Sequence, residues 1–197
     1  MILCGIPSRE WVPMDFAVCW ANLSVYNAVH GQQLALDNHR AAHPTVGRNM
    51  TLRYAEQLIS EGHDVTHIMW IDSDMAFPAD TIQRLLAHDK PIVGAAYCGR
   101  HHPYLPIYKP LPEGEEKTLL RKVSRLPGGM MLVRYDVHQA LGKFCYYEDR
   151  GEDFDFCKRA IEAGHDVWLD AKLTNELGHV GTKMFKTHVP YEGFSEE

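Results

Sequence analysis

The amino-acid sequence predicts a single α/β domain with parallel strand pairs in its sheet. Apolar, strand-like runs alternate with helix-like segments along the first half of the chain, and this order is typical of an α/β sheet. The run from Val65 to Ile71 is almost continuously hydrophobic, which indicates a strand covered on both faces. A length of 197 residues is most simply one domain, so we assign residues 1–197 to it.

The elements of the first half follow from apolar runs and from the residues that end them. Strands are expected at residues 1–6, 33–36, 65–71 and 91–97. Helices are expected at residues 13–29, 45–61 and 78–87. Pro13 and Pro78 each suit a first helical turn, and Gly62 is a good C-terminal stop. The apolar residues of the first helix form no clean stripe, so we expect it to be buried on more than one side.

The composition changes after the fourth strand. Residues 98–127 are rich in proline, glycine, histidine and charge, and they are too long for an ordinary loop, so we expect a functional insertion. Within it, residues 105–109 and 117–123 can pair as a hairpin. Strands then follow at residues 130–133 and 165–170, with helices at residues 136–141 and 152–164. The last helix would place Phe156, Ala160 and Ile161 on its core face, and residues 182–197 are expected to form a mobile tail.

Two carboxylates, Asp72 and Asp74, follow directly after the buried strand. Residues two apart in an extended chain point to the same side, and ligands of open α/β sheets collect at the carboxyl ends of strands. Two like charges there repel each other unless a cation lies beside them. A Mg²⁺-type ion that carries substrate phosphates binds through such carboxylates. A simpler alternative is that both aspartates cap the helix that begins near Pro78.

Other polar residues of the first half fit either a ligand or an ordinary structural role. The turn that starts at Pro7 and Ser8 ends the first strand, and it is a nucleotide-facing loop or a plain turn. Asp37 follows the second strand. Arg48 lies in the first turn of a helix, where a cation opposes the helix dipole. It therefore requires an anion, or a salt bridge to Glu56 or to a neighbouring loop.

Two features mark the second half. Gly128 and Gly129 allow close approach of a ligand to the backbone, or an unusual turn. Glu152 and Asp153 begin a helix, where carboxylates favour the dipole even without a further role. Near the end of the chain His179 lies among glycines.

Charge and cysteine usage narrow the class of protein. A formal net charge of −6 gives no general attraction to nucleic acid or to anionic membranes. A local basic cluster, for which a solvated face is the default, comprises Lys117, Arg121, Lys122 and Arg125. Five scattered cysteines without a C-x-x-C pair indicate reduced core thiols in a cytoplasmic protein. No apolar run approaches the ~18 residues of a membrane span, and the first residues lack the features of a signal peptide.

Taken together, these motifs resemble the GT-A glycosyltransferases, and most closely the small inverting enzymes of the family 2 type. The resemblance extends over most of the chain and is carried by the order and spacing of the motifs. They are Pro7-Ser8-Arg9, Arg48-Asn49, Asp72-Ser73-Asp74 with Phe77-Pro78, Val93-Gly94-Ala95-Ala96-Tyr97, Gly128-Gly129-Met130-Met131, Gly151-Glu152-Asp153-Phe154-Asp155-Phe156-Cys157 and Gly178-His179. The resemblance implies a Rossmann-like GT-A fold with a mostly parallel central sheet, in which residues 98–127 lie on the acceptor side.

The resemblance also implies roles for the donor side. Asp74 would bind Mn²⁺ or Mg²⁺ directly, and His179 would be the remaining protein ligand. Asp72 would contact the donor ribose, or the metal through water. The metal would hold the diphosphate of a nucleotide sugar, with a UDP-sugar as the first choice. The further donor-binding residues that the resemblance implies are Pro7, Ser8, Arg9, Asp37, Arg48, Ser73 and Lys183.

On the acceptor side, the resemblance makes Asp153 the catalytic base, with Glu152 shaping the acceptor site. A base that takes the proton of the acceptor hydroxyl is typically worth ~10²–10⁴-fold in rate. A metal at the departing diphosphate offsets the charge that develops there. The helix N-terminus lowers the basicity of Asp153, whereas burial beside Glu152 raises it. Glu152 and Asp155 compete with Asp153 for this role.

The acceptor and the rival functions are less constrained. A saccharide or lipid-linked sugar is the default acceptor, and a nucleic-acid base is less attractive because the chain is acidic. The rivals are a metal-dependent D-x-D phosphatase, a nucleotidyltransferase and a nucleotide-sugar-binding module without turnover. Phosphatase motifs normally follow the first strand and continue to a threonine, whereas Asp74 lies well into the chain and precedes Met75.

Overall fold

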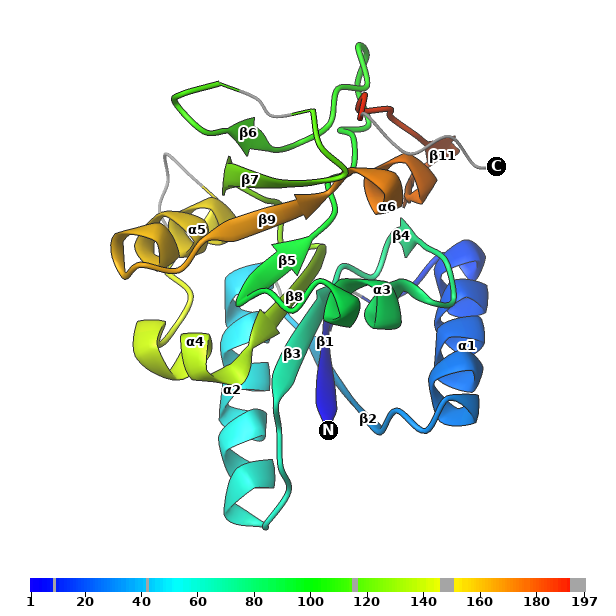
Figure 1. Cartoon of the computed structure of the whole chain (residues 1–197). Coiled ribbons are helices and arrows are strands. Elements are labelled where there is room, and N and C mark those ends of the chain that lie inside the picture. Colours follow the sequence, from blue (N-terminus) through cyan, green and yellow to red (C-terminus); the bar gives the residue numbers. More distant parts are fainter. Residues whose placement is uncertain (9, 42, 115–116, 146–150, 192–197) are drawn as a thin grey trace.

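A computed structural model describes residues 1–8, 10–41, 43–114, 117–145 and 151–191 of the chain (Figure 1). Within them, an eight-stranded sheet forms the centre of the molecule. Its strands are β1 (Ile2–Ser8), β2 (Leu34–Arg40), β3 (His67–Ile71), β5 (Ile92–Gly94), β6 (Lys109–Pro110), β7 (Leu120–Arg125), β8 (Met130–Arg134) and β9 (Val167–Asp170). They lie in the order β2-β1-β3-β8-β5-β9-β7-β6.

Most strands of this sheet run in one direction. β1 is parallel to β2 and β3, and β5 is parallel to β9. β8 runs antiparallel between β3 and β5, and β7 runs antiparallel between β9 and β6. The predicted α/β class with a mostly parallel central sheet is therefore confirmed.

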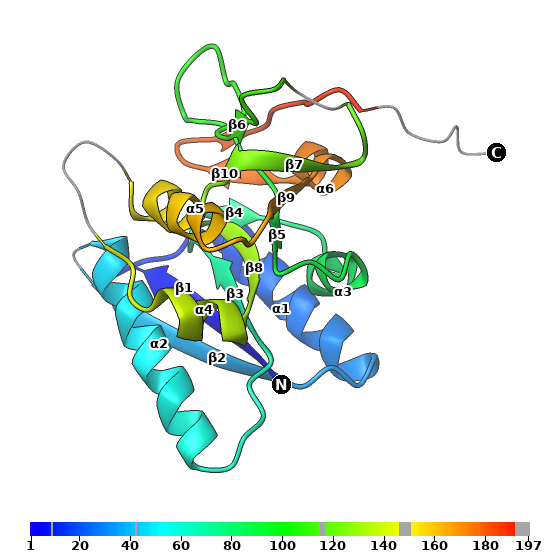
Figure 2. The same cartoon turned by 60° about the vertical axis from the view of Figure 1, so that its left-hand side comes forward.

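Helices cover both faces of the sheet (Figures 1 and 2). They are α1 (Met14–Val29), α2 (Pro44–Ser60), α3 (Thr81–Ala87), α4 (Tyr135–Leu141), α5 (Glu152–Glu162) and α6 (Ala171–Glu176). Buried residues of α2, α4 and α5 share one hydrophobic cluster, and those of α1, α3 and α6 share the other. The sheet thus lies between two helical layers, each with its own core.

The central strands supply both cores because their side chains alternate between the two faces. On β3, Ile68 and Trp70 pack under α2, α4 and α5, whereas Met69 and Ile71 pack on the side of α1 and α3. All four side chains are fully buried. The near-continuous hydrophobicity of this segment is therefore explained by burial on both sides.

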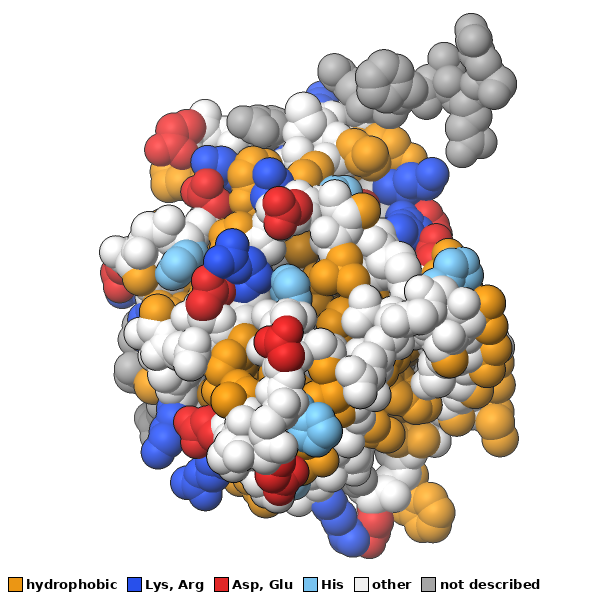
Figure 3. Space-filling view, turned by 60° about the horizontal axis from the view of Figure 1, so that its bottom comes forward, with side chains coloured by type: hydrophobic (Ala, Val, Ile, Leu, Met, Phe, Trp, Pro, Cys, Tyr) orange, Lys and Arg blue, Asp and Glu red, His pale blue; other side chains and the backbone are white. Residues whose placement is uncertain are grey.

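Two expectations for the helices are wrong. Helix α1 buries Phe16 and Leu23, but Met14, Val18, Val25 and Val29 are exposed, and hydrophobic side chains gather along the edge of the molecule over α1 (Figure 3). The helix is therefore buried on one side rather than on several. In α5, Phe156 and Ala160 are buried as expected, but Ile161 is 40% exposed and Cys157 is buried in its place.

Several short elements carried no readable signal in the sequence. Besides α6, they are the strands β4 (Met75–Ala76), β10 (Gly178–Val180) and β11 (Met184–Phe185), which form a second sheet in the order β11-β10-β4. Two or three residues are too few to show the alternation that identifies a strand. This small sheet nevertheless brings the region of His179 next to the segment that follows Asp74, because His179 pairs with Met75.

The insertion and the tail both contact the central domain. β6 and β7 pair antiparallel within residues 98–127, so a hairpin is present, but its strands are shifted from the predicted residues 105–109 and 117–123 to residues 109–110 and 120–125. In the tail, Val189 is buried, and its backbone exchanges hydrogen bonds of 2.7 and 3.0 Å with the side chain of Asn175. The remainder of the tail, residues 192–197, lies outside the described residues, and the mobility of the tail stays a prediction.

None of the helices in the described part of the chain combines the length and apolar character needed to cross a membrane. All five cysteines are free, and Cys4, Cys98 and Cys157 are buried. Burial raises the pKa of Cys4 and of Cys157 to about 12, so both thiols stay protonated.

Candidate active site

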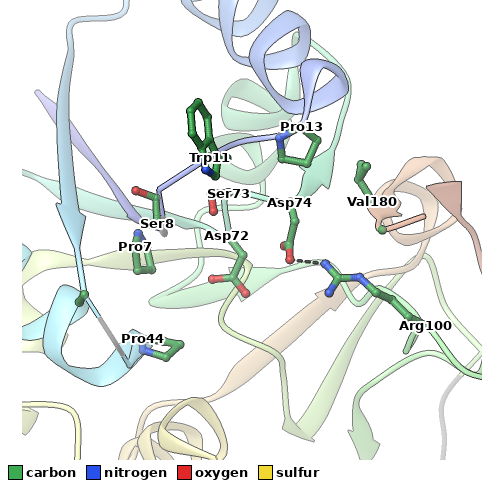
Figure 4. Close-up of a pocket in the computed structure, with 12 residues that line it drawn as sticks. Pro7, Ser8, Trp11, Pro13, Pro44, Asp72, Ser73, Asp74, Arg100 and Val180 are labelled. Carbon is green, nitrogen blue, oxygen red and sulfur yellow. Dashed lines mark hydrogen bonds and ion pairs between the residues drawn. The ribbon is translucent and has the colours of Figure 1, made fainter. Parts of the chain in front are cut away.

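A pocket of about 390 Å³ opens at the carboxyl ends of β1 and β3. One wall is formed by Pro7 and Ser8 at the end of β1, and the floor by Asp72, Ser73 and Asp74 (Figure 4). The opposite wall comes from Arg100 of the insertion and from Val180 and Gly181 of the segment around β10. Trp11, Pro13, Ala41 and Pro44 complete the lining. Polar residues at the ends of β1 and β3 thus line one cavity, at the sheet edge where the sequence predicts ligand binding.

Both carboxylate oxygens of Asp72 are hydrogen-bonded to other side chains. Its Oδ1 accepts a hydrogen bond of 3.0 Å from Nη2 of Arg48, and its Oδ2 accepts one of 3.1 Å from the hydroxyl of Tyr97. Burial, together with the charge of Asp72, raises the pKa of Tyr97 well above its usual range, so the hydroxyl remains a donor. Both carboxylate oxygens of Asp72 therefore already have protein partners, which disfavours a direct bond from Asp72 to a metal.

The glycine pair beneath Asp72 is required by this packing. A Cβ at Gly129 would lie 2.5 Å from Oδ2 of Asp72 and 2.6 Å from the hydroxyl of Tyr97. A Cβ at Gly128 would lie 2.8 Å from Nη2 of Arg48 and 3.1 Å from Cβ of Asp153. The close approach predicted for these glycines is therefore made by the protein's own site residues.

Arg48 links Asp72 to Glu152 at the start of α5. Its side chain is 2% exposed, and it contacts Asp72, the carbonyl of Gly128 (3.2 Å) and Oε1 of Glu152 (3.4 Å). Burial opposes the charged form, but the carboxylates of Asp72, Glu152 and Asp153 outweigh it, so the pKa of Arg48 is raised. The sequence left open whether Arg48 binds an anionic ligand or forms a salt bridge. The structure shows salt bridges, to Asp72 and to Glu152. Arg48 lies behind Asp72 and not in the lining of the pocket.

Asp74 has a more exposed partner than Asp72 has. Its side chain is 34% exposed, it forms an ion pair with the guanidinium of Arg100, and its Oδ2 lies 3.7 Å from Nε2 of His179. Burial acts to raise the pKa of Asp74, but His179 and Arg100 outweigh burial and lower it. Asp74 is therefore ionised at neutral pH and faces the pocket.

The ring of His179 is oriented for ligation. Its Nδ1 lies 2.8 Å from the carbonyl oxygen of Cys98, which can only accept, so Nδ1 carries the proton. In the neutral ring the lone pair is then on Nε2, the atom that faces Asp74. A metal-binding histidine is usually held in this way, with the ring nitrogen that does not face the metal bonded to a carbonyl oxygen.

The described residues supply a partial metal site. None of them form a group of three or more His, Cys, Asp or Glu side chains that could hold an ion. A pair made by Asp74 and His179 fits an ion that takes its other ligands from phosphate oxygens and water. The imidazole favours a transition-metal ion such as Mn²⁺ over Mg²⁺, which prefers oxygen ligands. Asp74 and His179 therefore suit the predicted metal ion as ligands, provided that a substrate supplies the remaining ligand atoms.

Asp153 lies on the other side of the glycine pair. Its Oδ2 accepts a hydrogen bond of 2.9 Å from the backbone of Gly128, and its Oδ1 accepts one of 2.7 Å from the backbone of Phe154. Burial is the largest influence and raises the pKa of Asp153, and the charge of Glu152 adds to it. In the competition noted from the sequence, burial therefore outweighs the helix N-terminus.

The two competitors for the role of base are engaged elsewhere. Glu152 is buried and contacts Arg48, and Asp155 is 3% exposed with its Oδ2 2.9 Å from Nε of Arg159. The hydrogen bonds that Asp153 accepts come from the backbone N–H groups of Gly128 and Phe154, whereas Glu152 and Asp155 pair with arginines.

Other predicted residues lie further from the pocket or cannot be placed. Asp37 lies within β2 rather than after it, because β2 extends to Arg40, and its Oδ2 is 3.0 Å from Nε2 of His39. Asp37 does not line the pocket. Lys183 is exposed between β10 and β11, with its Nζ 5.4 Å from the ring centre of Phe185. Arg9 lies outside the described residues.

Three residues of the site were not singled out from the sequence. Arg100 and Tyr97 contact the two motif aspartates, and Trp11, which is 85% exposed, lies at the rim of the pocket. Two of them carried a signal in the sequence: Arg100 is a cation near the start of the insertion, and Trp11 is an aromatic residue in a polar turn. The basic cluster did not lead to the site, because Arg121 is fully buried and Nζ of Lys122 lies 2.6 Å from Asp166.

Solved structures share this fold. The A197 protein from STIV has a TM-score of 0.62 at 12% identity, with 99% of this chain and 98% of that chain covered. The catalytic domain of Drosophila β1,4-galactosyltransferase 7 with xylobiose has a TM-score of 0.59 at 15% identity, over 91% of this chain and 70% of that one. A mutant of that enzyme with manganese, UDP-Gal and xylobiose has the same TM-score at 14% identity and the same coverage.

The nucleoside-diphosphate-sugar pyrophosphorylase from Vibrio cholerae RC9 has a TM-score of 0.55 at 12% identity, over 90% of this chain and 94% of that one. Neither a protein-family model nor a curated protein sequence matches the chain. The likenesses show a shared fold, so the predicted GT-A-type fold of the nucleotide-sugar transferases is confirmed.

Proposed function

We propose that this protein is a glycosyltransferase that moves a sugar from a nucleoside-diphosphate donor to an acceptor hydroxyl. The observation that carries the proposal is the approach of Nε2 of His179 to Asp74, which lies in the floor of the pocket. Asp153 is linked to Asp72, in the same floor, through the backbone of Gly128 and the side chain of Arg48. The fold is shared with a galactosyltransferase whose structure holds manganese, UDP-Gal and xylobiose, which supports this chemistry.

The pocket provides a place for each part of such a donor. Trp11 offers an exposed ring on which a nucleobase can stack, and stacking of this kind tolerates different bases. The diphosphate would lie over Asp74 and His179, which would hold Mn²⁺. When bound, the ion acts as a Lewis acid that offsets the charge of the departing diphosphate. Arg100 adds positive charge to the wall of the pocket, and Lys183 would have to approach from the segment between β10 and β11.

Asp153 would act as the general base. It takes the proton of the acceptor hydroxyl while the hydroxyl oxygen bonds to the anomeric carbon and the bond to the diphosphate breaks. A single displacement of this kind inverts the anomeric centre. The raised pKa of Asp153 makes it a better base than a solvated aspartate. The acceptor is a saccharide, and the reaction is placed in the cytoplasm, where free thiols remain reduced.

The test is a thermal-shift screen of nucleotide sugars with and without Mn²⁺, followed by assays of donor hydrolysis and sugar transfer. We expect UDP-sugars to stabilise the protein only when Mn²⁺ is present. Asp74→Ala should abolish this metal-dependent stabilisation, because the carboxylate that faces the ion is lost. Stabilisation of Asp74→Ala equal to that of the wild type would contradict the proposal.

A nucleotidyltransferase is the second candidate, favoured by the likeness to the Vibrio cholerae pyrophosphorylase. Such an enzyme joins a sugar phosphate to a nucleoside triphosphate and releases pyrophosphate. Release of pyrophosphate from a nucleoside triphosphate and a sugar phosphate would select it. Release of a nucleoside diphosphate from a nucleotide sugar would select the glycosyltransferase.

A further inference from the structure

Arg100 contacts the same carboxylate oxygen of Asp74 that faces His179. The oxygen of Asp74 that pairs with the Arg100 guanidinium is Oδ2, which is also the oxygen that lies 3.7 Å from Nε2 of His179. An ion held by Asp74 and His179 at the usual ~2.0–2.2 Å would bond to this same region of the carboxylate. A divalent ion and a guanidinium cannot share one oxygen without strong repulsion, so the two cations compete.

Arg100 is placed so that it can leave. Its side chain is 38% exposed, and the carboxylate of Asp74 is its only hydrogen-bond partner among the described residues. An exposed ion pair of this kind contributes little to stability, so separating it costs little. By contrast, the buried Arg48 is bonded to three separate groups and is fixed.

Arg100 is also placed to receive a phosphate. It lines the pocket wall beside Val180 and Gly181, and Gly181 makes room for it, because a Cβ there would lie 3.0 Å from Cδ of Arg100. A guanidinium binds phosphate oxygens through two parallel hydrogen bonds. Nζ of Lys183 lies 5.6 Å from the ring centre of Tyr104, on the loop that follows Arg100, so Lys183 is a second cation near this loop although it does not line the pocket.

We propose that Arg100 is an exchangeable counter-ion of Asp74, which holds the metal site closed until a nucleoside diphosphate draws the guanidinium away. Without a donor, Arg100 neutralises Asp74 and keeps the affinity for Mn²⁺ low. When a diphosphate enters, Arg100 pairs with its oxygens and Asp74 is released to the ion. Metal and donor then bind cooperatively, and the chain does not retain the ion between turnovers. This inference rests on the proposed function, because it takes the donor to be a nucleoside diphosphate.

The test compares Mn²⁺ binding by the wild type, Arg100→Gln and Arg100→Lys, with and without saturating UDP. Free Mn²⁺ is followed by electron paramagnetic resonance, so no turnover is needed. In the absence of UDP, Arg100→Gln should bind Mn²⁺ roughly tenfold more tightly than the wild type, a typical size for coupling between two ligands. Arg100→Lys keeps the charge and should remain near the wild type. UDP should tighten Mn²⁺ binding of the wild type by about tenfold more than that of Arg100→Gln.

Arg134→Gln is the matched control, because it removes an exposed arginine that pairs with Asp136 outside the pocket. It changes the net charge equally, and its Mn²⁺ affinity should equal that of the wild type. If Arg100→Gln binds Mn²⁺ no more tightly than Arg134→Gln while UDP still tightens binding in both, the counter-ion role is wrong and the proposed function stands. If the wild type binds neither Mn²⁺ nor UDP under any of these conditions, the proposed function fails and the inference fails with it.

Discussion

The two aspartates of the D-x-D motif lie two residues apart in the sequence, yet their surroundings differ in kind. Asp72 has both carboxylate oxygens bonded to buried groups, Arg48 and Tyr97. Asp74 is a third exposed, pairs with the exposed Arg100 and faces His179 across 3.7 Å. The two side chains are almost equally exposed, at 28% and 34%, but the partner arginine of Asp72 is 2% exposed and that of Asp74 is 38% exposed. One carboxylate therefore belongs to a network around the buried Arg48, and the other to a set of groups that can exchange partners.

This difference separates architecture from ligand binding. A buried ion pair is hard to break because each charge left alone stays out of water, whereas an exposed pair can trade its partner for water or a ligand. The Arg48 network (Arg48, Asp72, Gly128, Glu152 and Asp153) would therefore set the geometry in which Asp153 acts as the proposed base. The open group (Asp74, Arg100, His179 and Lys183) would supply the changing contacts to metal and diphosphate.

The largest expected effect comes from Asp153, the residue of the Arg48 network that we propose as the base. Asp153→Asn keeps the shape of the side chain but cannot take a proton, so sugar transfer should fall by about 10²–10⁴-fold. Binding of UDP with Mn²⁺ should be unchanged, because Asp153 does not line the donor pocket. Initial rates of transfer and calorimetric titration with UDP measure the two effects. Transfer at the wild-type rate would show that the base is another residue.

The second prediction compares the two arginines as stabilising groups. Arg48→Met leaves the buried Glu152 and the partly exposed Asp72 without their cation, and should lower the free energy of unfolding by about 3–5 kcal/mol. Arg100→Gln breaks an exposed pair and should change it by at most about 1 kcal/mol. Urea denaturation of both variants gives the two values. Equal losses would show that the two regions do not differ as described.

The third prediction concerns the glycine beneath Asp72. Gly129→Ala places a methyl group against the Asp72 carboxylate and the Tyr97 hydroxyl, so it should cost about 1–3 kcal/mol of stability through overpacking. Gly99→Ala is the control, because a Cβ at Gly99 meets nothing within 4 Å. Thermal unfolding of the two variants should show a large decrease in Tm for the first and almost none for the second.

The smallest predicted effect is a change in pH dependence. In the proposed mechanism the base must be ionised, so activity should be lost as the pH falls through the pKa of Asp153, which lies above its usual value. Glu152→Gln removes a negative neighbour that helps to raise this pKa. The acid limb of the kcat/KM profile should therefore move to lower pH. A limb that stays in place or moves to higher pH would contradict the electrostatic coupling of the two carboxylates.

Much of the fold was predictable because its main elements carry strong local patterns. The apolar run that became β3, the alternation with helices and the stop at Gly62 are all properties of short sequence windows. The outer face of α1 misled the prediction, because its exposed valines are as apolar as its core residues. The strands of the second sheet were missed because they are held by pairing across the chain and not by local preference.

The candidate site divides in the same way. The positions of Asp72, Asp74 and Asp153 at the ends of a strand and at the start of a helix could be predicted from the sequence. What surrounds each of them could not, because Arg48, Tyr97, Arg100 and His179 reach the site from segments between 24 and 105 residues away. Sequence by itself determined which groups stand at the edge of the sheet. Only the tertiary structure decided which carboxylate pairs with a buried partner and which pairs with an exposed one, since burial and partner choice arise from contacts between distant segments.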